Sequence, residues 1–540
     1  SATNGATVAI VSVTTDANGE ATTTLTNTTA GASTVTAKIN NVSQMVDTTF
    51  IPDSSTATIA NGALTITVDN MKANGTDANA VQAIVTDAYG NVIPSATVAF
   101  SAGNGATVTT ASATTDGNGV ATTTLTNTMA GVSTVTAAIG NAHPTVDTHF
   151  LPDNGTATIV QGALTVTTDK AKANGSDTNA VKAIVTDANS NVVPGAVVEF
   201  SADNGATVTT ASATTDGNGV ATTTLTNTSA GVSIVTAKIN TTHLTVDTHF
   251  MPDGGTATII AGALTVTTDK AKANGTDANA VKAIVTDAYG NLVPGAVVAF
   301  SATNGATVTT VSATADGNGE ATTTLTNTTA GVSAVTAKIN TTHLAVDTHF
   351  MPDDGTATII AGALTVTTDK AKANGTDTNA VKAVVTDANS NVVPGAVVTF
   401  SANNGATVTT VSATTDGNGE ATTTLTNITA GVSIVTAAIN QASLTVDTHF
   451  IPDNSTATLA KGALTVVLDN AVANGKDTNT VQAVVTDAKG NRVPGEVVAF
   501  SANNGATVIT ASVTTDANGE ATTTLTNITA GVSAVTATVG

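Results

Sequence analysis

The sequence repeats itself with a period of one hundred residues, and this period constrains the fold more than any other feature. The segment GALTVTTDKAKANG recurs unchanged at Gly162–Gly175, Gly262–Gly275 and Gly362–Gly375. All ten phenylalanines fall at multiples of fifty, from Phe50 to Phe500, so each full period carries two. Such a period has the size of a whole domain rather than of one rung of a solenoid. The chain is therefore predicted to be a tandem array of similar domains.

Within one copy, short runs of alternating apolar residues are separated by turn signals such as Asn204-Gly205 and Asp216-Gly217-Asn218-Gly219. Thr and Val favour strands, and aromatic residues make up only 2% of the chain, so small aliphatic cores are expected. Seven or so short strands with frequent turns predict an all-β sandwich. In the copy 156–255 the expected strands are Thr156–Asp169 (interrupted near Gly162), Asn179–Asp187, Ala196–Ala202, Ala206–Ser212, Val220–Asn227, Val232–Asn240 and His243–Met251.

Proline marks the joints between copies, because Pro52, Pro152, Pro252, Pro352 and Pro452 each precede an aspartate. We place domain boundaries just after these pairs. The expected domains are 1–55 (the C-terminal half of a unit), 56–155, 156–255, 256–355, 356–455 and 456–540 (a unit without its last strand). Since the first unit lacks its early strands, we expect a fragment cut without regard to domain boundaries.

Comparison of the copies predicts which side of each strand faces the core. Val220 has Glu320 as one of its counterparts, so this position faces water, and its neighbours face alternately in and out. Glu199 and Lys182 orient their strands in the same way. The residues expected inside are Val181, Ala183, Val185, Val198, Phe200, Ala221, Thr223, Leu225, Val235, Ala237 and Ile239.

Composition excludes several classes of protein. The net charge of -22 argues against nucleic-acid binding, which needs clusters of Lys and Arg. No apolar run reaches the about 18 residues of a membrane-spanning helix, so no membrane contact is expected from this segment. Cysteine is absent, which removes disulfides and thiol chemistry. No Ser-His-Asp pattern, phosphate loop or aromatic cluster repeats with the strands. We therefore expect no enzyme, no catalytic residue, no cofactor site and no metal site.

Four motifs, in a fixed order, resemble the group 1 bacterial immunoglobulin-like repeat of intimin- and invasin-type adhesins. In one copy they are V-T-D-A-x-G-N-x-V-P-G at Val285–Gly295, F-S-A-x-N-G-A-T-V at Phe300–Val308, and A-G-x-x-x-V-T-A at Ala330–Ala337. The remaining motif, T-D-x-N-G-x-A-T-T-T-L-T, opens with Ala315 instead of Thr in this copy. The resemblance covers essentially the whole chain.

The resemblance implies immunoglobulin-like β-sandwich domains in tandem, forming an elongated, monomeric rod. It also implies an inverse autotransporter, anchored in the bacterial outer membrane by a region outside this sequence. A host-cell or bacterial receptor would be bound through tip domains that this sequence does not include. The predicted function is thus the cell-surface stalk of an adhesin.

Acidic and histidine side chains are the candidate metal ligands of the sequence. His243 and His249 lie about 20 Å apart along one strand, too far to share a metal. Asp247 and His249 share a face, but two ligands make a poor site, and a solvated strand face is the simpler reading. Asp216-Gly217-Asn218-Gly219 resembles the start of a calcium loop, yet loop position 12 is Asn227, so we predict a turn.

The joint offers a second acidic group. Asp247 and Asp253 approach the junction of two copies, and Asp354 adds a carboxylate beside Asp353. Calcium could stiffen such a joint, although Pro252-Asp253 can also stiffen it by fixing φ and accepting turn hydrogen bonds. Lys170 and Lys172 are read as solubilising edge charges.

Two alternatives to the stalk remain open. Each repeat could itself bind a host or neighbouring-cell ligand, with avidity from repetition. A binder should present a repeated aromatic or arginine patch, but only Tyr89 and Tyr289 qualify, and other copies have Asn or Lys there. The chain could also be a calcium-stiffened extender of another class of large adhesin.

Overall fold

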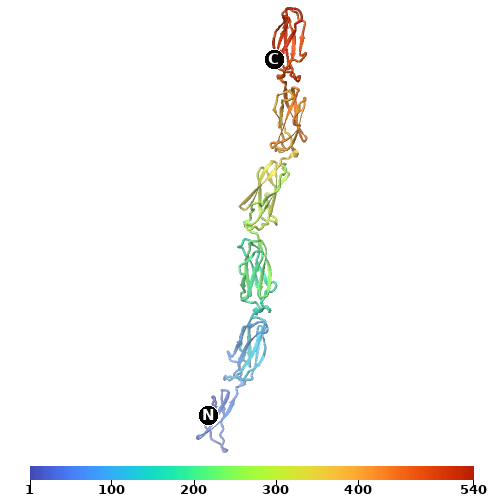
Figure 1. The fold of residues 1–540 in the computed structure, drawn as a ribbon. Coiled ribbons are helices and arrows are strands. Elements are labelled where there is room, and N and C mark those ends of the chain that lie inside the picture. The colour runs from blue at the N-terminus through green and yellow to red at the C-terminus, as the bar shows by residue number, and fades with distance from the viewer. The chain divides into compact units, whose positions relative to one another are not determined.

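The computed structural model describes residues 1–540, which form two compact units. The first unit holds Ser1–Thr256 with Asp287–Asn291, and the second holds Ala257–Thr286 with Leu292–Gly540. Strands follow one another along the whole chain, from the blue to the red end of the ribbon (Figure 1). The helical segments are 3-10 turns of three residues, and no helix is long and apolar enough to cross a membrane. The all-β prediction is confirmed.

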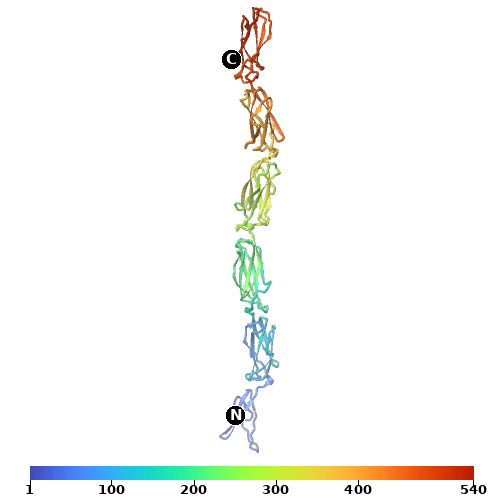
Figure 2. The ribbon, with the colours of Figure 1, turned by 45° about the vertical axis from the view of Figure 1, so that its right-hand side comes forward.

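The copy 156–255 shows the repeated architecture, two sheets of strands (Figure 2). One sheet has the order β14-β16-β20-β18, and the other has the order β15-β22-β21-β17-β19. The elements of this copy are η2 (Asn154–Thr156), β14 (Leu164–Thr168), β15 (Ala171–Lys172), β16 (Asn179–Ile184), β17 (Val197–Ala202), β18 (Thr207–Val208), β19 (Ser212–Thr214), β20 (Val220–Thr226), β21 (Gly231–Ile239) and β22 (Thr242–Met251).

The other copies use the same plan. Residues 1–55 hold β1 (Thr7–Val8), β2 (Leu25–Thr26), β3 (Gly31–Ile39), β4 (Val42–Phe50) and η1 (Ser54–Thr56). Residues 56–155 hold β5 (Leu64–Val68), β6 (Met71–Lys72), β7 (Ala78–Ile84), β8 (Thr97–Ala102), β9 (Thr107–Val108), β10 (Ser112–Thr114), β11 (Val120–Thr126), β12 (Gly131–Ala138) and β13 (Thr145–Leu151). Residues 256–355 hold η3 (Gly254–Thr256) at their start, then β23 (Leu264–Thr268), β24 (Ala278–Ile284), β25 (Val297–Ala302), β26 (Thr307–Val308), β27 (Ser312–Thr314), β28 (Glu320–Thr326), β29 (Gly331–Ile339) and β30 (Thr342–Phe350).

Residues 356–455 hold η4 (Asp354–Thr356) at their start, then β31 (Leu364–Thr368), β32 (Ala371–Lys372), β33 (Asn379–Val384), β34 (Val397–Ala402), β35 (Thr407–Val408), β36 (Ser412–Thr414), β37 (Glu420–Thr426), β38 (Gly431–Ile439) and β39 (Ala442–Ile451). Residues 456–540 hold η5 (Asn454–Thr456) at their start, then β40 (Leu464–Leu468), β41 (Asn479–Val484), β42 (Val497–Ala502), β43 (Thr507–Val508), β44 (Ser512–Thr514), β45 (Glu520–Thr526) and β46 (Val535–Val539).

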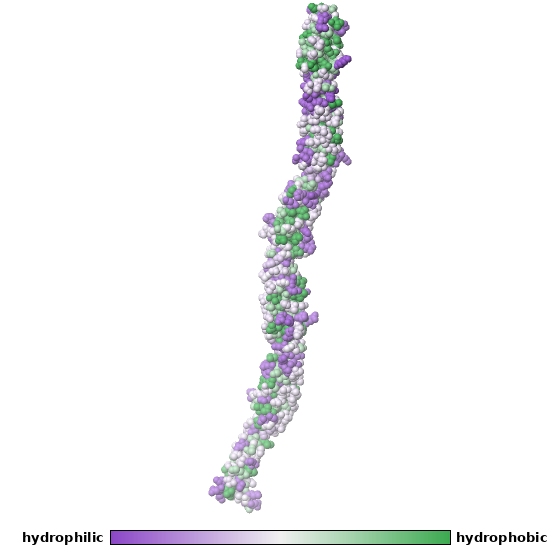
Figure 3. All heavy atoms as spheres, viewed as in Figure 1, coloured by the Kyte–Doolittle hydropathy of each residue, from purple (hydrophilic) through white to green (hydrophobic).

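Each copy from 56 onward has its own aliphatic core between the two sheets. Phe200 and Phe250 are the large side chains in the core of 156–255, with 3% and 2% of their surface exposed. The residues predicted to face inward are all buried, which confirms the assignment of faces. Outside the cores, apolar residues form separate patches broken by polar ones on the face shown in Figure 3.

Two strand predictions were wrong. The expected strand Ala206–Ser212 is divided, because β18 pairs with β20 in one sheet and β19 pairs with β17 in the other. The short strand β15 was not expected at all. It follows a register shift between Val166 and Thr168 and a bend at Lys170, whose φ of 64° lies in the left-handed region. This bend lets the chain leave the sheet of β14 and pair with β22.

Glycine is required at the tight turn that precedes β20. Gly219 has a φ of 73°, and a Cβ added there would lie 2.7 Å from the carbonyl oxygen of Val185. The turn is closed by Asp216, whose Oδ1 accepts hydrogen bonds from the backbone nitrogens of Asn218 and Val220, each at 2.9 Å. The prediction of a turn at residues 216–219 is therefore confirmed.

Candidate functional site: the joints between copies

The acidic residues predicted at the joint do not gather into one group. Asp253 comes just before η3, where its Oδ1 accepts from the backbone nitrogen of Gly255 at 3.1 Å and from Nζ of Lys172 at 3.0 Å. Asp247 lies six residues earlier on β22, opposite Ile234. The carboxylate of Asp253 is thus paired with an ammonium group. The interpretation of Lys172 as only a solubilising edge charge was wrong.

In the second unit, the neighbouring carboxylates of Asp353 and Asp354 also pair with a lysine. Nζ of Lys272 lies 3.1 Å from Oδ1 of Asp353 and 2.8 Å from Oδ1 of Asp354. The hydrogen bond from Lys272 lowers the pKa of Asp354, and the two carboxylates raise the pKa of Lys272. One lysine therefore stands between the two oxygens that a cation would have to bridge.

His249 shares the exposed face of β22 with Asp247, but its ring is paired with another carboxylate. Nδ1 of His249 is 3.2 Å from Oδ2 of Asp169, a residue that the sequence did not single out. His243 pairs across the strands with Lys238. The structure holds no group of three or more His, Cys, Asp or Glu side chains placed to bind a metal.

A buried aspartate, Asp187, organises the joint instead. Its side chain is on the hairpin 187–191 and only 3% of the residue is exposed. Oδ1 accepts from the backbone nitrogens of Asn189 and Asn191, both at 2.9 Å. Oδ2 accepts from the backbone nitrogen of Asp153 at 3.0 Å and from Nδ2 of Asn191 at 2.9 Å. A buried carboxylate with this many donors is well compensated for its burial.

Asn191 connects this hairpin to the preceding copy, and all the residues involved belong to the first compact unit. Its Oδ1 accepts from the backbone nitrogen of Ala130 at 2.8 Å, and its Nδ2 donates to the carbonyl of Thr128 at 2.9 Å. The side-chain amide therefore pairs with two backbone groups, much as a neighbouring strand would. Because Asp187 also holds Nδ2, the amide is oriented before it meets its partners.

The same pair of bonds recurs at other joints. In the first unit Asn91 bonds the nitrogen of Ala30 at 2.7 Å and the carbonyl of Thr28 at 2.8 Å. In the second unit Asn391 and Asn491 bond their partners at 2.7 to 3.0 Å. We call the Asp and Asn of this hairpin, such as Asp187 and Asn191, the joint hook.

In several copies hydrogen bonds lower the pKa of the hook aspartate. Burial alone would raise the pKa of Asp87, but the hydrogen bonds from Asn91, Asp53 and Tyr89 lower it to about 2. The pKa values of Asp387 and Asp487 are lowered by the same balance. The sequence shows the two hook residues as an Asp and an Asn four residues apart in every V-T-D-A-x-x-N segment, but this local spacing does not indicate the backbone partners sixty-one positions earlier.

The position that holds Tyr289, and Asn189 in another copy, lies two residues after the aspartate of the hook. Oη of Tyr289 donates to the carbonyl of Asn174 at 3.0 Å, inside the first unit. The equivalent Asn189 donates through Nδ2 to the carbonyl of Ala73 at 2.9 Å. This position therefore makes a joint contact whether it holds Tyr or Asn.

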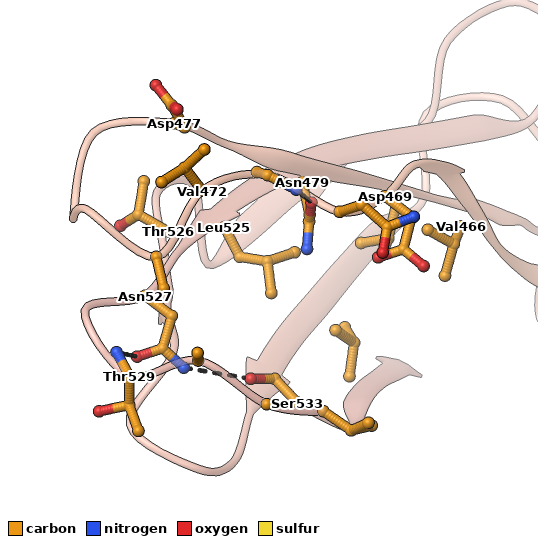
Figure 4. Close-up of a pocket in the computed structure, with 18 residues that line it drawn as sticks. Val466, Asp469, Val472, Asp477, Asn479, Leu525, Thr526, Asn527, Thr529 and Ser533 are labelled. Carbon is orange, nitrogen blue, oxygen red and sulfur yellow. Dashed lines mark hydrogen bonds between the residues drawn. The ribbon is translucent and has the colours of Figure 1, made fainter.

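A cavity of about 560 Å³ lies in the copy 456–540, among residues of β40, β41 and β45 (Figure 4). Asp469 and Asn470 line it. Their counterparts Asp169 and Lys170 are hydrogen-bonded to β22, a strand with no equivalent among residues 456–540. The cavity therefore lies at the position that β22 occupies in the copy 156–255.

The comparisons with known proteins agree with this architecture. The family model described as "Bacterial Ig-like domain (group 1)" matches residues 61–151, 161–251, 261–351, 361–451 and 461–540. Among curated proteins, the inverse autotransporter adhesin YeeJ of Escherichia coli K12 is 37% identical over 124 residues, which is 22% of this chain and 5% of that protein. The chain therefore spans only a small part of this relative.

Solved structures of similar fold include invasin, a bacterial integrin-binding protein, with a TM-score of 0.36 and 22% identity over 76% of this chain and 87% of that one. The Escherichia coli adhesin FdeC has a TM-score of 0.39 and 20% identity over 56% of this chain and 99% of that one.

Proposed function

The chain belongs to the bacterial Ig-like domain (group 1) family, and on this premise we propose that it is the stalk of a bacterial surface adhesin. The stalk spaces an adhesive part of the protein from the outer membrane. Its domains have the boundaries 1–55, 56–155, 156–255, 256–355, 356–455 and 456–540. It works as a monomeric rod without catalytic, cofactor or metal residues.

The joint hook is the observation that supports this proposal. A spacer has to keep successive domains from folding back on one another, and a flexible Gly/Ser linker could not do that. Here Asn191 ties the copy 156–255 to the one before it by two hydrogen bonds, and Asp187 fixes the direction of the amide. The repetition of these bonds from joint to joint favours a stiff chain.

The hook also supports a function that depends on length. Each complete copy carries the hook near its start and the backbone groups that receive the next hook near its end, as Asn191 and Ala130 illustrate. Removing or adding one period of one hundred residues therefore leaves every remaining joint with both its hook and the backbone groups that the hook binds. The tyrosine position supports the same view, because Tyr289 makes a joint contact. The proposal that the repeats themselves bind a ligand gains no such support.

Small-angle X-ray scattering of the whole chain tests the proposal. At about 35–40 Å per domain, five domains in series give a largest dimension of roughly 200 Å and a radius of gyration of about 60 Å. A compact particle of the same length would have a radius of gyration of about 24 Å. Deletion of residues 156–255 should shorten the particle by about 35–40 Å. A radius of gyration near the compact value would refute the stalk.

A joint variant tests the hook by the same measurement. Asn191→Ala and Asn391→Ala together remove the side-chain bonds of two joints, so the scattering should show a more flexible chain with a shorter average length. Asn218→Ala is the matched control, because this asparagine is exposed and lies in a turn inside one copy. If the joint variant and the control scatter alike, the hook does not stiffen the joint.

A further inference from the structure

In each complete copy, the segment by which the chain enters pairs with the strand by which the chain leaves. In 156–255 the entering segment forms β14, which pairs with β16, and then β15, which pairs with the exit strand β22. The pair β15–β22 is parallel, with Ala171 opposite Phe250 and Lys172 opposite Met251. We propose that this pair and the side chains around it form a mechanical clamp that resists stretching of the copy. The proposal rests on the stalk function, because a stalk carries tension.

The backbone part of the clamp consists of bonds between residues 170–173 and the end of β22. The nitrogen of Lys170 donates to the carbonyl of His249 at 3.0 Å, and that of Ala173 donates to the carbonyl of Met251 at 2.7 Å. On the exit side, Nζ of Lys172 also pairs with Oδ1 of Asp253 at 3.0 Å, just beyond β22. Farther from the clamp, Oγ1 of Thr158 and Thr242 form an exposed contact of 3.2 Å. The backbone hydrogen bonds between β15 and β22 are therefore reinforced by an ion pair at the same place.

Asp169 adds three bonds from the entry side. Its Oδ1 accepts from Oγ1 of Thr248 at 2.8 Å and from the nitrogen of His249 at 2.6 Å, while Oδ2 lies 3.2 Å from Nδ1 of His249. Burial would raise the pKa of Asp169, but these bonds lower it to about 2, so the carboxylate is charged. Hydrogen bonds to a charged group are stronger than neutral ones.

Asn179 bridges entry and exit from inside the domain. It is fully buried, accepts from the nitrogen of Ala171 at 2.9 Å through Oδ1, and donates to the carbonyl of His249 at 2.8 Å through Nδ2. Water cannot readily replace these bonds, because the side chain is shielded from solvent. A single amide therefore holds both strands of the parallel pair.

The direction of the strands determines how tension acts on these bonds. The two strands run the same way, and tension pulls β15 toward its beginning and β22 toward its end. The strands must then slide past each other, which loads all the clamp bonds together. An antiparallel hairpin pulled at its open end would separate one pair at a time. Unfolding under force is governed by the rate of unfolding, so bonds that must break first control it.

The other complete copies repeat the clamp, and the copy 456–540 does not. Asn79, Asn279 and Asn379 donate to the carbonyls of His149, His349 and His449, each at 2.9 Å. Asn479 still accepts from the nitrogen of Ala471 at 2.8 Å, but residues 456–540 contain no exit strand for it to hold. Within residues 456–540 this asparagine therefore holds only the entry side.

Single-molecule stretching of the whole chain from its two ends tests the clamp. Each complete copy should lengthen the chain by about 290–325 Å when it unfolds, which is its extended length less the about 35–40 Å that it already spans when folded. Four events of this size should need a higher force than the event from 456–540. Replacement of all four bridging asparagines (Asn79, Asn179, Asn279 and Asn379) by Ala should make the complete copies unfold about tenfold faster at the same force, because two bonds are lost per copy.

A matched control separates the clamp from general stability. Asn227 is also a buried asparagine with several bonds, donating to the carbonyl of Asn204 at 3.0 Å and to Oγ of Ser233 at 3.3 Å, but it touches neither β15 nor β22. Replacement of Asn227 and its equivalents Asn127, Asn327 and Asn427 by Ala should lower Tm while leaving the rate under force nearly unchanged. Equal acceleration in both sets of variants, or in neither, would overturn the clamp.

A milder variant covers the case in which the bridging replacements do not fold. Thr248→Val, with the same change at Thr148, Thr348 and Thr448, keeps the shape of the side chain and removes one bond to Asp169 per copy. It should accelerate unfolding under force by about threefold. An unchanged rate would refute the clamp while leaving the stalk intact, since the length of the particle in solution is measured independently.

Discussion

Truncation of a core phenylalanine gives a quantitative test of the face assignment. Phe200 lies on β17 between the two sheets with 3% of its surface exposed, and the core around it is aliphatic. Burial of roughly 150–250 Å² by an aromatic side chain, at about 25 cal/mol per Å², contributes about 4–6 kcal/mol. Measured Phe→Ala changes in cores cost about 3–5 kcal/mol, which agrees with this figure. Since a domain has only about 5–15 kcal/mol of stability, Phe200→Ala should remove a large part of it.

Differential scanning calorimetry of the whole chain can detect this loss in one copy. A loss of about 4 kcal/mol in a domain of this size lowers Tm by roughly 15–30 °C, so one domain's share of the heat should move to a separate early peak. Val197→Ala is the control, because Val197 is on the same strand but 55% exposed, and it should cost less than about 1 kcal/mol. If both variants melt like the parent chain, the alternation along β17 has been misread.

Three further predictions concern the turns, the carboxylates and calcium. Gly219→Ala should cost about 2 kcal/mol or more, because its Cβ would meet the carbonyl of Val185, whereas Gly217→Ala meets nothing within 4 Å and should leave Tm nearly unchanged. Burial would raise the pKa of Asp69, but hydrogen bonds outweigh it and lower this pKa to about 2, below the value of about 3.9 in an unfolded chain. The ionised Asp69 therefore stabilises the folded state fully above about pH 4, and this stabilisation is lost as the pH falls through about 2. Melting followed by circular dichroism should show Tm falling through this window, and a constant Tm would contradict it. Addition of calcium or of a chelator should leave the melting curve unchanged, because lysines already pair with the joint carboxylates; a rise of several degrees with calcium would contradict this.

The sequence by itself determined the repeat, the all-β class and the side of each strand that faces the core. Strand periodicity is local, so the charged counterparts of Val220 oriented Ala221 and Leu225 without any tertiary information. The tight turns were also predictable from the residue types. Asn204 and Gly205 both adopt positive φ, of 51° and 76°, and few other residues tolerate that conformation. These features depend on neighbours within a few positions.

Only the tertiary structure decided which distant residues meet. Asp169 and His249 are eighty positions apart, and Asn191 reaches a backbone sixty-one positions earlier. No spacing rule along the chain links such residues, because the topology of the sheets brings them together. The strand β15 was missed for the same reason: its two residues form a strand only because a bend at Lys170 delivers them to β22. The joint hook and the clamp are therefore products of packing, built from residues that look like ordinary surface Asp, Asn and Lys in the sequence.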